Sequence, residues 1–121
     1  MIALLKFLIY LAQKYQKFLP NDPKQKSLTL QWLMFQVSNL GPMMGQAMYF
    51  QRIAPLNGVK DTFAIKRYVS ESLRLLKILD HQLISKKYLV GNSFTIADIA
   101  MYPWAKSHYW AKVSIDGLVH L

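Results

Sequence analysis

The sequence predicts an all-α fold. Apolar residues recur at helical spacing in about four stretches, and glycine and proline residues separate these stretches. No stretch shows the sustained alternation of an all-β protein. The 121 residues are enough for one domain and too few for two of ordinary length, and a hydrophobic content of 53% excludes intrinsic disorder. Because the chain has no cysteine, a disulfide scaffold, a cysteine zinc site, an iron–sulfur cluster and a cysteine nucleophile are excluded.

The charge is strongly positive, with fifteen basic residues against six acidic ones and a formal net charge of +9. The basic residues are spread along the chain without a block of five like charges, which indicates a solvated basic surface and no nucleic-acid partner. The apolar start, residues 1–12, is shorter than the ~20 residues of a spanning helix. It carries no convincing secretory signal. We therefore expect no membrane partner and a cytoplasmic location.

The first helix is predicted from Ile2 to Lys17, followed by a short linker at residues 18–22. One face carries Leu4, Leu8, Leu11 and Tyr15. The residues Ile2, Phe7 and Ile9 widen the apolar surface beyond one stripe, so this helix is expected to pack on two sides.

The second helix is predicted to begin at Pro23, with Asp22 as its N-cap, because proline suits the first helical position. Helical periodicity continues past Gly41-Pro42. We therefore expect a kinked continuation at the proline and an end before Pro55 and Gly58.

The third helix is predicted over residues 62–84 with Asp61 as its cap. A fourth helix is predicted to begin at Thr95. Two sets of residues spaced by seven mark the buried seam of the third helix: Ile65, Ser72 and Leu79, and Val69, Leu76 and Leu83. Thr95 and Asp98 form a capping box, with Phe94 and Ile99 as the matching hydrophobic staple. The fourth helix contains Pro103, which tertiary packing must offset.

Motifs that carry chemistry are mostly missing: there is no glycine-rich phosphate loop and no nucleophile elbow. The histidines are not spaced as metal ligands, so no metal site is expected, and Asp98 is better explained as a cap than as a catalytic acid. Two features stay open. The methionines Met43, Met44 and Met48 could line an adaptable pocket or fill the core. Lys66 and Arg67 could face an anionic ligand or form an ordinary surface pair.

Two blocks of sequence resemble a known family. Residues 31–37 (QWLMFQV) and 40–46 (LGPMMGQ) are similar to the first long helix of the helical domain in bacterial glutathione S-transferases, closest to the nu-class, disulfide-reductase-like branch. Residues 88–91 (YLVG), 94–100 (FTIADIA) and 102–104 (YPW) resemble the capping box and core helix of that superfamily. The family fold joins a thioredoxin-like domain, which carries the catalytic residue, to an all-helical domain.

The resemblance implies that residues 1–17 are the last helix of a thioredoxin-like domain, residues 18–22 a linker, and residues 23–121 a helical domain incomplete at its end. It places the residue that activates the glutathione thiol upstream of Met1, so no catalytic residue is assigned. The family's Glu-Ser pair, which holds the γ-glutamyl end of glutathione, aligns with Ala3 and Leu4.

The same resemblance assigns Arg67 to glutathione, the co-substrate of the family, because a guanidinium suits a carboxylate. It assigns the interdomain cleft to Gly41, Pro42, Met43, Met44 and Gln46. It implies a homodimer in the intact protein, with glutathione conjugation or glutathione-dependent disulfide reduction as the parent activity. We expect this chain alone to perform neither reaction. The alternative is a stand-alone helical protein-interaction module that uses the apolar surface of the first helix.

Overall fold

The computed structural model describes residues 2–121, with side chains from residue 4 onward. Within that range the chain forms helices and no β-strand, apart from two isolated bridges in the loop before the last long helix. The all-α prediction is confirmed. The elements in order are α1 (Ile2–Tyr15), α2 (Pro23–Phe35), η1 (Gln36–Leu40), α3 (Gly41–Met48), η2 (Tyr49–Ile53), η3 (Ala54–Asn57), α4 (Thr62–Gln82), α5 (Ile96–Lys106) and η4 (Ser107–Tyr109).

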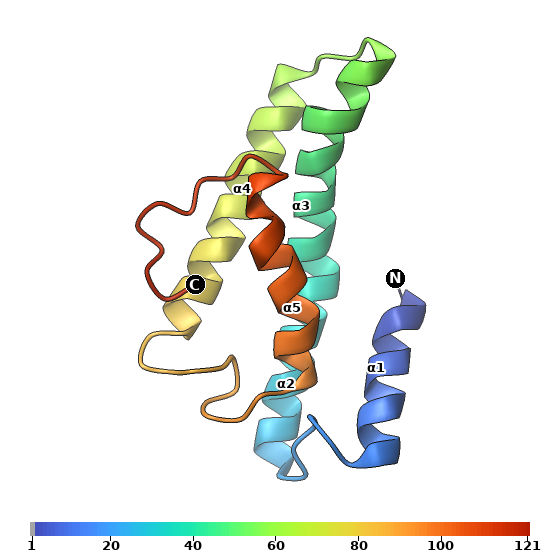
Figure 1. Cartoon of the computed structure of the whole chain (residues 1–121), viewed down its shortest axis with the longest axis vertical. Helices are drawn as coiled ribbons and strands as arrows, with labels where there is room; N and C mark the ends of the chain where they lie inside the picture. The colour runs from blue at the N-terminus through green and yellow to red at the C-terminus, as the bar shows by residue number, and fades with distance from the viewer. Residues whose placement is uncertain (1) are drawn as a thin grey trace.

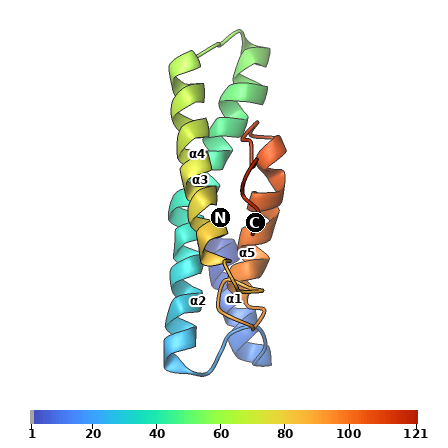
Figure 2. The same ribbon diagram turned by 90° about the vertical axis from the view of Figure 1, so that its left-hand side faces the viewer.

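Helices α3 and α4 lie side by side, and α5 packs across them on one side (Figures 1 and 2). Helix α1 lies beside α2 and α5, at the end of the molecule away from the turn that joins α3 to α4. It ends two residues before the predicted Lys17, because Gln16 has a φ of 51° and Phe18 a φ of 62°. These left-handed residues turn the chain out of the helix. Neither is a glycine, the residue that usually adopts this conformation, so the sequence did not indicate the turn.

The start of α2 follows the prediction: the Asp22 carboxylate accepts a hydrogen bond from the Gln25 N–H at 2.9 Å, and Pro23 is the first helical residue. The helix also continues past Gly41-Pro42, as predicted. It does so through a π-helical turn, η1, in which the Gly41 N–H donates to the Gln36 carbonyl. A π turn supplies the local irregularity that a proline without an N–H requires.

The end of this long helical segment was predicted before Pro55 and Gly58; the segment extends past Pro55 and ends before Gly58. A second π turn, η2, leads into the 3-10 turn η3, which contains Pro55, and Gly58 follows η3 with a φ of 74°. Pro55 lies at the start of η3, where a backbone N–H has no acceptor within the helix. The missing N–H of proline therefore costs no hydrogen bond at this position.

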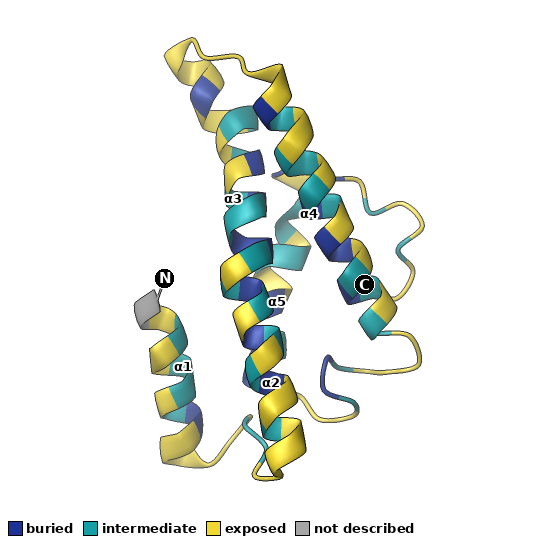
Figure 3. Cartoon of the chain, turned by 180° about the vertical axis from the view of Figure 1, so that it is seen from behind, coloured by how far each residue is buried: buried dark blue, intermediate teal, exposed yellow. Residues whose placement is uncertain are grey.

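The main core lies where α3, α4 and α5 meet (Figure 3). The predicted seam of α4 is confirmed at Ser72, Leu76 and Leu79, which are at most 1% exposed. A smaller cluster joins α1 to α2 and α5 through Ala12, Leu33 and Ile96. The Phe18 carbonyl accepts a hydrogen bond from the Ile96 N–H, which ties the segment after α1 to the start of α5.

The capping box predicted for α5 is present. The Asp98 carboxylate accepts hydrogen bonds from the Thr95 N–H at 2.8 Å and the Thr95 hydroxyl at 3.0 Å, and Thr95 Oγ1 accepts from the Ala97 N–H. The other Asp98 oxygen accepts from the Leu89 N–H at 2.9 Å, which fixes the preceding loop. Pro103 lies inside α5, as predicted. No helix among the described residues is long and apolar enough to cross a membrane.

Candidate functional site

A groove runs along the side of the bundle between η1–α3 and the first half of α4. Its volume is about 720 Å³. Helix α4 forms one wall because its opposite face is buried: Ala64 and Leu76 point into the core, which leaves the polar residues of the first turns facing outward. The lining residues are Asn39, Met43, Phe63, Lys66, Arg67, Ser70, Glu71 and Arg74.

The start of α4 is fixed by its N-cap, and this sets the positions of the groove cations. The Asp61 carboxylate accepts a hydrogen bond from the Ala64 N–H at 2.9 Å, as the sequence predicts. From this cap onward, residues three, four and seven positions apart share one helical face. Phe63, Lys66, Arg67, Ser70 and Arg74 have this spacing, so α4 presents three cationic side chains on the groove wall.

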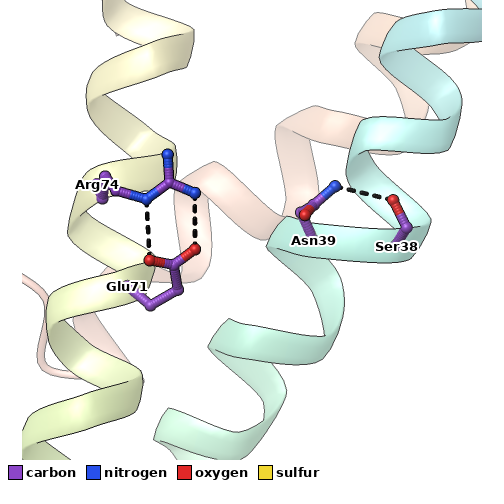
Figure 4. A network of polar contacts seen from close by, with 4 residues as sticks. All are labelled: Ser38, Asn39, Glu71 and Arg74. Carbon is purple, nitrogen blue, oxygen red and sulfur yellow. Dashed lines mark hydrogen bonds and ion pairs between the residues drawn. The ribbon is translucent and has the colours of Figure 1, made fainter.

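One of these cations is already paired. Arg74 donates two hydrogen bonds to the Glu71 carboxylate, from Nε to Oε2 at 2.9 Å and from Nη2 to Oε1 at 2.7 Å (Figure 4). This bond to Arg74 lowers the pKa of Glu71 against the raising effect of burial, and the charge of Arg67 lowers the pKa further. The Glu71 hydrogen bond raises the pKa of Arg74.

The groove therefore keeps an excess of positive charge. Lys66, Arg67 and Arg74 face it together with the one carboxylate of Glu71, which leaves a net charge of +2 on the lining side chains. The other wall is apolar at Met43 and polar at Asn39, whose side-chain amide donates to the Ser38 hydroxyl at 2.8 Å (Figure 4). Chemically, the arrangement suits an organic anion with an apolar portion.

The predicted site residues are only partly brought together. Arg67 and Met43 line the same groove, whereas Gly41, Pro42, Met44 and Gln46 do not. Met44 is fully buried in the main core. Of the two interpretations left open for the methionines, core packing is therefore the one that holds for Met44. Gly41 is also buried, and a Cβ there would lie 2.8 Å from the Gln36 side-chain nitrogen, so glycine permits close packing at this position.

Five groove residues were not assigned to a site from the sequence: Asn39, Phe63, Ser70, Glu71 and Arg74. The signal was available for those on α4. Phe63 and Ser70 lie on the face of α4 opposite the apolar seam, at the spacing of Arg67, so a search for the polar face would have found them. Asn39 lies in the η1 turn, which no sequence pattern predicted.

The histidines do not gather. His108 Nδ1 lies 2.8 Å from the Val113 carbonyl oxygen, while His81 and His120 are exposed. Among residues 2–121 no group of three or more His, Cys, Asp or Glu side chains could hold a metal ion.

Comparison with known proteins finds relatives that are similar in sequence and in fold. The family model described as "Glutathione S-transferase, C-terminal domain" matches residues 43–117. The disulfide-bond oxidoreductase YfcG of Escherichia coli (strain K12) is 40% identical over 109 residues, which cover 90% of this chain and 48% of that protein.

Solved structures agree in fold and sequence. A glutathione transferase from Pseudomonas putida, with one glutathione disulfide bound per subunit, is 38% identical with a TM-score of 0.86, covering 94% of this chain and 51% of that one. The nitrogen regulation fragment of the yeast prion protein Ure2p is 28% identical with a TM-score of 0.83, covering 94% and 56%. The chain thus spans about a third to a half of the length of the curated relatives it matches.

Proposed function

Since the chain belongs to the glutathione S-transferase C-terminal domain family, we propose that it supplies the helical half of a glutathione-binding site. The observation that carries the proposal is the cationic groove, in which Arg67 and the apolar Met43 lie on facing elements. A tripeptide such as glutathione offers carboxylates for the guanidinium and an apolar or thiol-linked portion for the methionine. The relative from Pseudomonas putida holds glutathione disulfide.

The second half of the site is the rest of a thioredoxin-like domain, of which α1 is the last helix. The outer face of α1 is apolar and open: Leu4 and Tyr15 are each 61% exposed, and Phe7 and Tyr10 are more than half exposed. Exposed apolar patches of this kind mark surfaces that another protein surface covers. In this proposal the thioredoxin-like domain activates the thiol, and Arg67 pairs with a glutathione carboxylate from the helical side.

The reaction we propose is that of the family: glutathione conjugation or glutathione-dependent disulfide reduction, in the cytoplasm and in a homodimer. The 121 residues alone are proposed to perform neither reaction, because in this proposal the thioredoxin-like domain supplies the group that activates the thiol. Met43 and Arg67 contribute binding and orientation, not proton transfer.

The test is calorimetric titration of glutathione disulfide into the 121-residue chain and into a fusion that places a thioredoxin-like domain before it. The fusion is expected to bind and the chain alone is not. In the fusion, Arg67→Gln is expected to weaken binding about tenfold or more, since it removes a charge-assisted hydrogen bond. Lys60→Gln, in the exposed loop before α4, is the control and is expected to change nothing. Micromolar binding by the chain alone would overturn the proposal.

The second candidate function is a stand-alone interaction module, and the open apolar face of α1 is the observation that favours it. Light scattering on the purified chain distinguishes the two candidates. A stable, monodisperse homodimer or heterocomplex that forms without a thioredoxin-like domain supports the module. Aggregation that the fused domain abolishes supports the helical-half function.

A further inference from the structure

The cationic groove has one carboxylate among its lining side chains, that of Glu71. Glu71 lies on α4 four residues after Arg67 and three before Arg74, so the three side chains share one face of the helix. We propose that Glu71 is a specificity-determining residue of this groove: by pairing with Arg74 it limits the positive charge that a bound anion meets, and so limits the preference for the more highly charged ligand. This inference rests on the glutathione-binding function proposed above and names a residue that tunes that site.

Glu71 occupies the hydrogen-bonding edge of the Arg74 guanidinium. Nε and Nη2 of Arg74 donate to the two oxygens of the carboxylate at 2.9 and 2.7 Å, so each oxygen accepts one bond of a fork (Figure 4). This paired geometry fixes the direction of the guanidinium, which a single contact would not do. Arg74 is therefore held by its own helix and is less available to a ligand in the groove.

Lys66 and Arg67 are in a different situation. Neither has a carboxylate within ion-pair distance among the side chains that the structure describes, and both are exposed on the groove wall. These two cations can accept an anionic ligand without first giving up a partner. The groove thus offers two of its three cations to a ligand and keeps the third paired.

The charge of Glu71 also acts on Arg67. The pKa of Glu71 is lowered by its hydrogen bond to Arg74 and, in addition, by the charge of Arg67, so the carboxylate lies within the electrostatic field of that guanidinium. The attraction works in both directions, and a negative charge beside Arg67 weakens the pull of Arg67 on a ligand carboxylate. Because the Glu71 side chain is 35% exposed, water and salt screen this interaction and the expected effect is moderate.

Glutathione and glutathione disulfide differ in the property that this arrangement senses. Near pH 7 glutathione carries two carboxylates and one ammonium group, and the disulfide carries twice as many of each, so its net negative charge is doubled. An added positive charge in the groove therefore favours the disulfide more than glutathione. By lowering the charge of the groove, Glu71 keeps the affinities of the two ligands closer together.

The experiment is calorimetric titration, at low ionic strength, of the fusion that joins a thioredoxin-like domain to this chain, with glutathione disulfide and with glutathione. Glu71→Gln raises the charge of the groove by one unit and is expected to tighten disulfide binding about threefold and glutathione binding less. Arg74→Gln lowers the charge by one unit and is expected to weaken disulfide binding about threefold, although in this proposal Arg74 does not contact the ligand. The double variant restores the net charge and is expected to bind as the unsubstituted fusion does.

The control and the contrary outcomes separate charge from structure. Asp116→Asn changes the total charge of the chain by the same unit at an exposed residue outside the groove, and it is expected to leave both affinities unchanged. An ion pair with a merely structural role would weaken binding when broken from either side. Weaker binding in Glu71→Gln, or a double variant as weak as Arg74→Gln, would overturn this inference and leave the proposed function intact. No binding of either ligand by the fusion would overturn both.

A second measurement needs no glutathione and uses the 121-residue chain itself. Phenylglyoxal modifies the neutral form of the arginine side chain, and mass spectrometry of the digested protein gives the rate at each arginine. Arg67 is expected to react about threefold or more faster than Arg74, because the Glu71 hydrogen bond raises the pKa of Arg74. Glu71→Gln is expected to bring Arg74 to the rate of Arg67, with circular dichroism to check that the variant is folded. Equal rates at the two arginines of the unsubstituted chain would overturn the inference.

Discussion

Helix α1 has a more apolar sequence than α4, yet it is α4 whose apolar side chains are buried. In α4 the apolar side chains Leu75, Leu76 and Leu79 are at most 1% exposed. In α1 only Ala12 is buried among the described side chains, while Leu4 and Phe7 face outward. The contrast separates two uses of hydrophobic residues: α4 holds this domain together, and the outer face of α1 is available to another surface.

The first prediction, with the largest expected effect, tests whether the buried side chains of α4 hold the domain together. Leu76→Ala removes a fully buried side chain from the main core, and such deletions cost about 2–5 kcal/mol because they lose transfer free energy and leave a cavity. Urea unfolding followed by circular dichroism measures the loss. Leu56→Ala, at a residue that is 81% exposed, is the matched control and is expected to change the free energy of unfolding by less than about 0.5 kcal/mol.

The second prediction concerns the hydrogen bonds of Asp98, which join the start of α5 to the loop before it. Asp98→Ala leaves the buried N–H groups of Leu89 and Thr95 without their acceptor, so we expect a loss of about 2–4 kcal/mol in the free energy of unfolding. The same substitution at Asp61, an exposed cap that accepts one hydrogen bond, is expected to cost less, at about 0.5–2 kcal/mol. Equal losses would show that the extra bonds to the loop contribute nothing.

The last prediction, with the smallest expected effect on stability, tests whether the outer face of α1 lies outside the domain's core. Phe7→Ser on the outer face of α1 is expected to change the free energy of unfolding by less than about 0.5 kcal/mol, because the ring is 54% exposed and contributes little to the core. The same variant is expected to reduce self-association in light scattering. A loss above about 1 kcal/mol would instead make this face part of the domain's own core. Ala12→Asp, on the buried side of the same helix, is the control that should destabilise strongly.

The helices and their starts were predictable because local chemistry determines them. The caps at Asp22, Asp61 and Thr95 each satisfy N–H groups within three residues, so the sequence around each cap contains the whole signal. The left-handed residue Gln16 and the turn η1 were not predictable, because their conformations depend on how distant segments pack. The groove was half predictable: Arg67 lies on a recognisable face of α4, whereas the meeting of α4 with Met43 and Asn39 is tertiary.

The π turn η1 has a consequence for how one continuous helical segment serves two neighbours. Each π turn adds about one residue to the helical repeat, which rotates everything after it by about 100° relative to an uninterrupted helix. Before the turn, Leu33 on α2 points into the small cluster with Ala12 and Ile96; after it, Met44 and Ala47 on α3 point into the main core against α4. The change of helical phase thus lets one continuous helical segment pack against α1 near its start and against α4 further along. Deleting one residue within η1 would restore the phase and misdirect one of these two contacts.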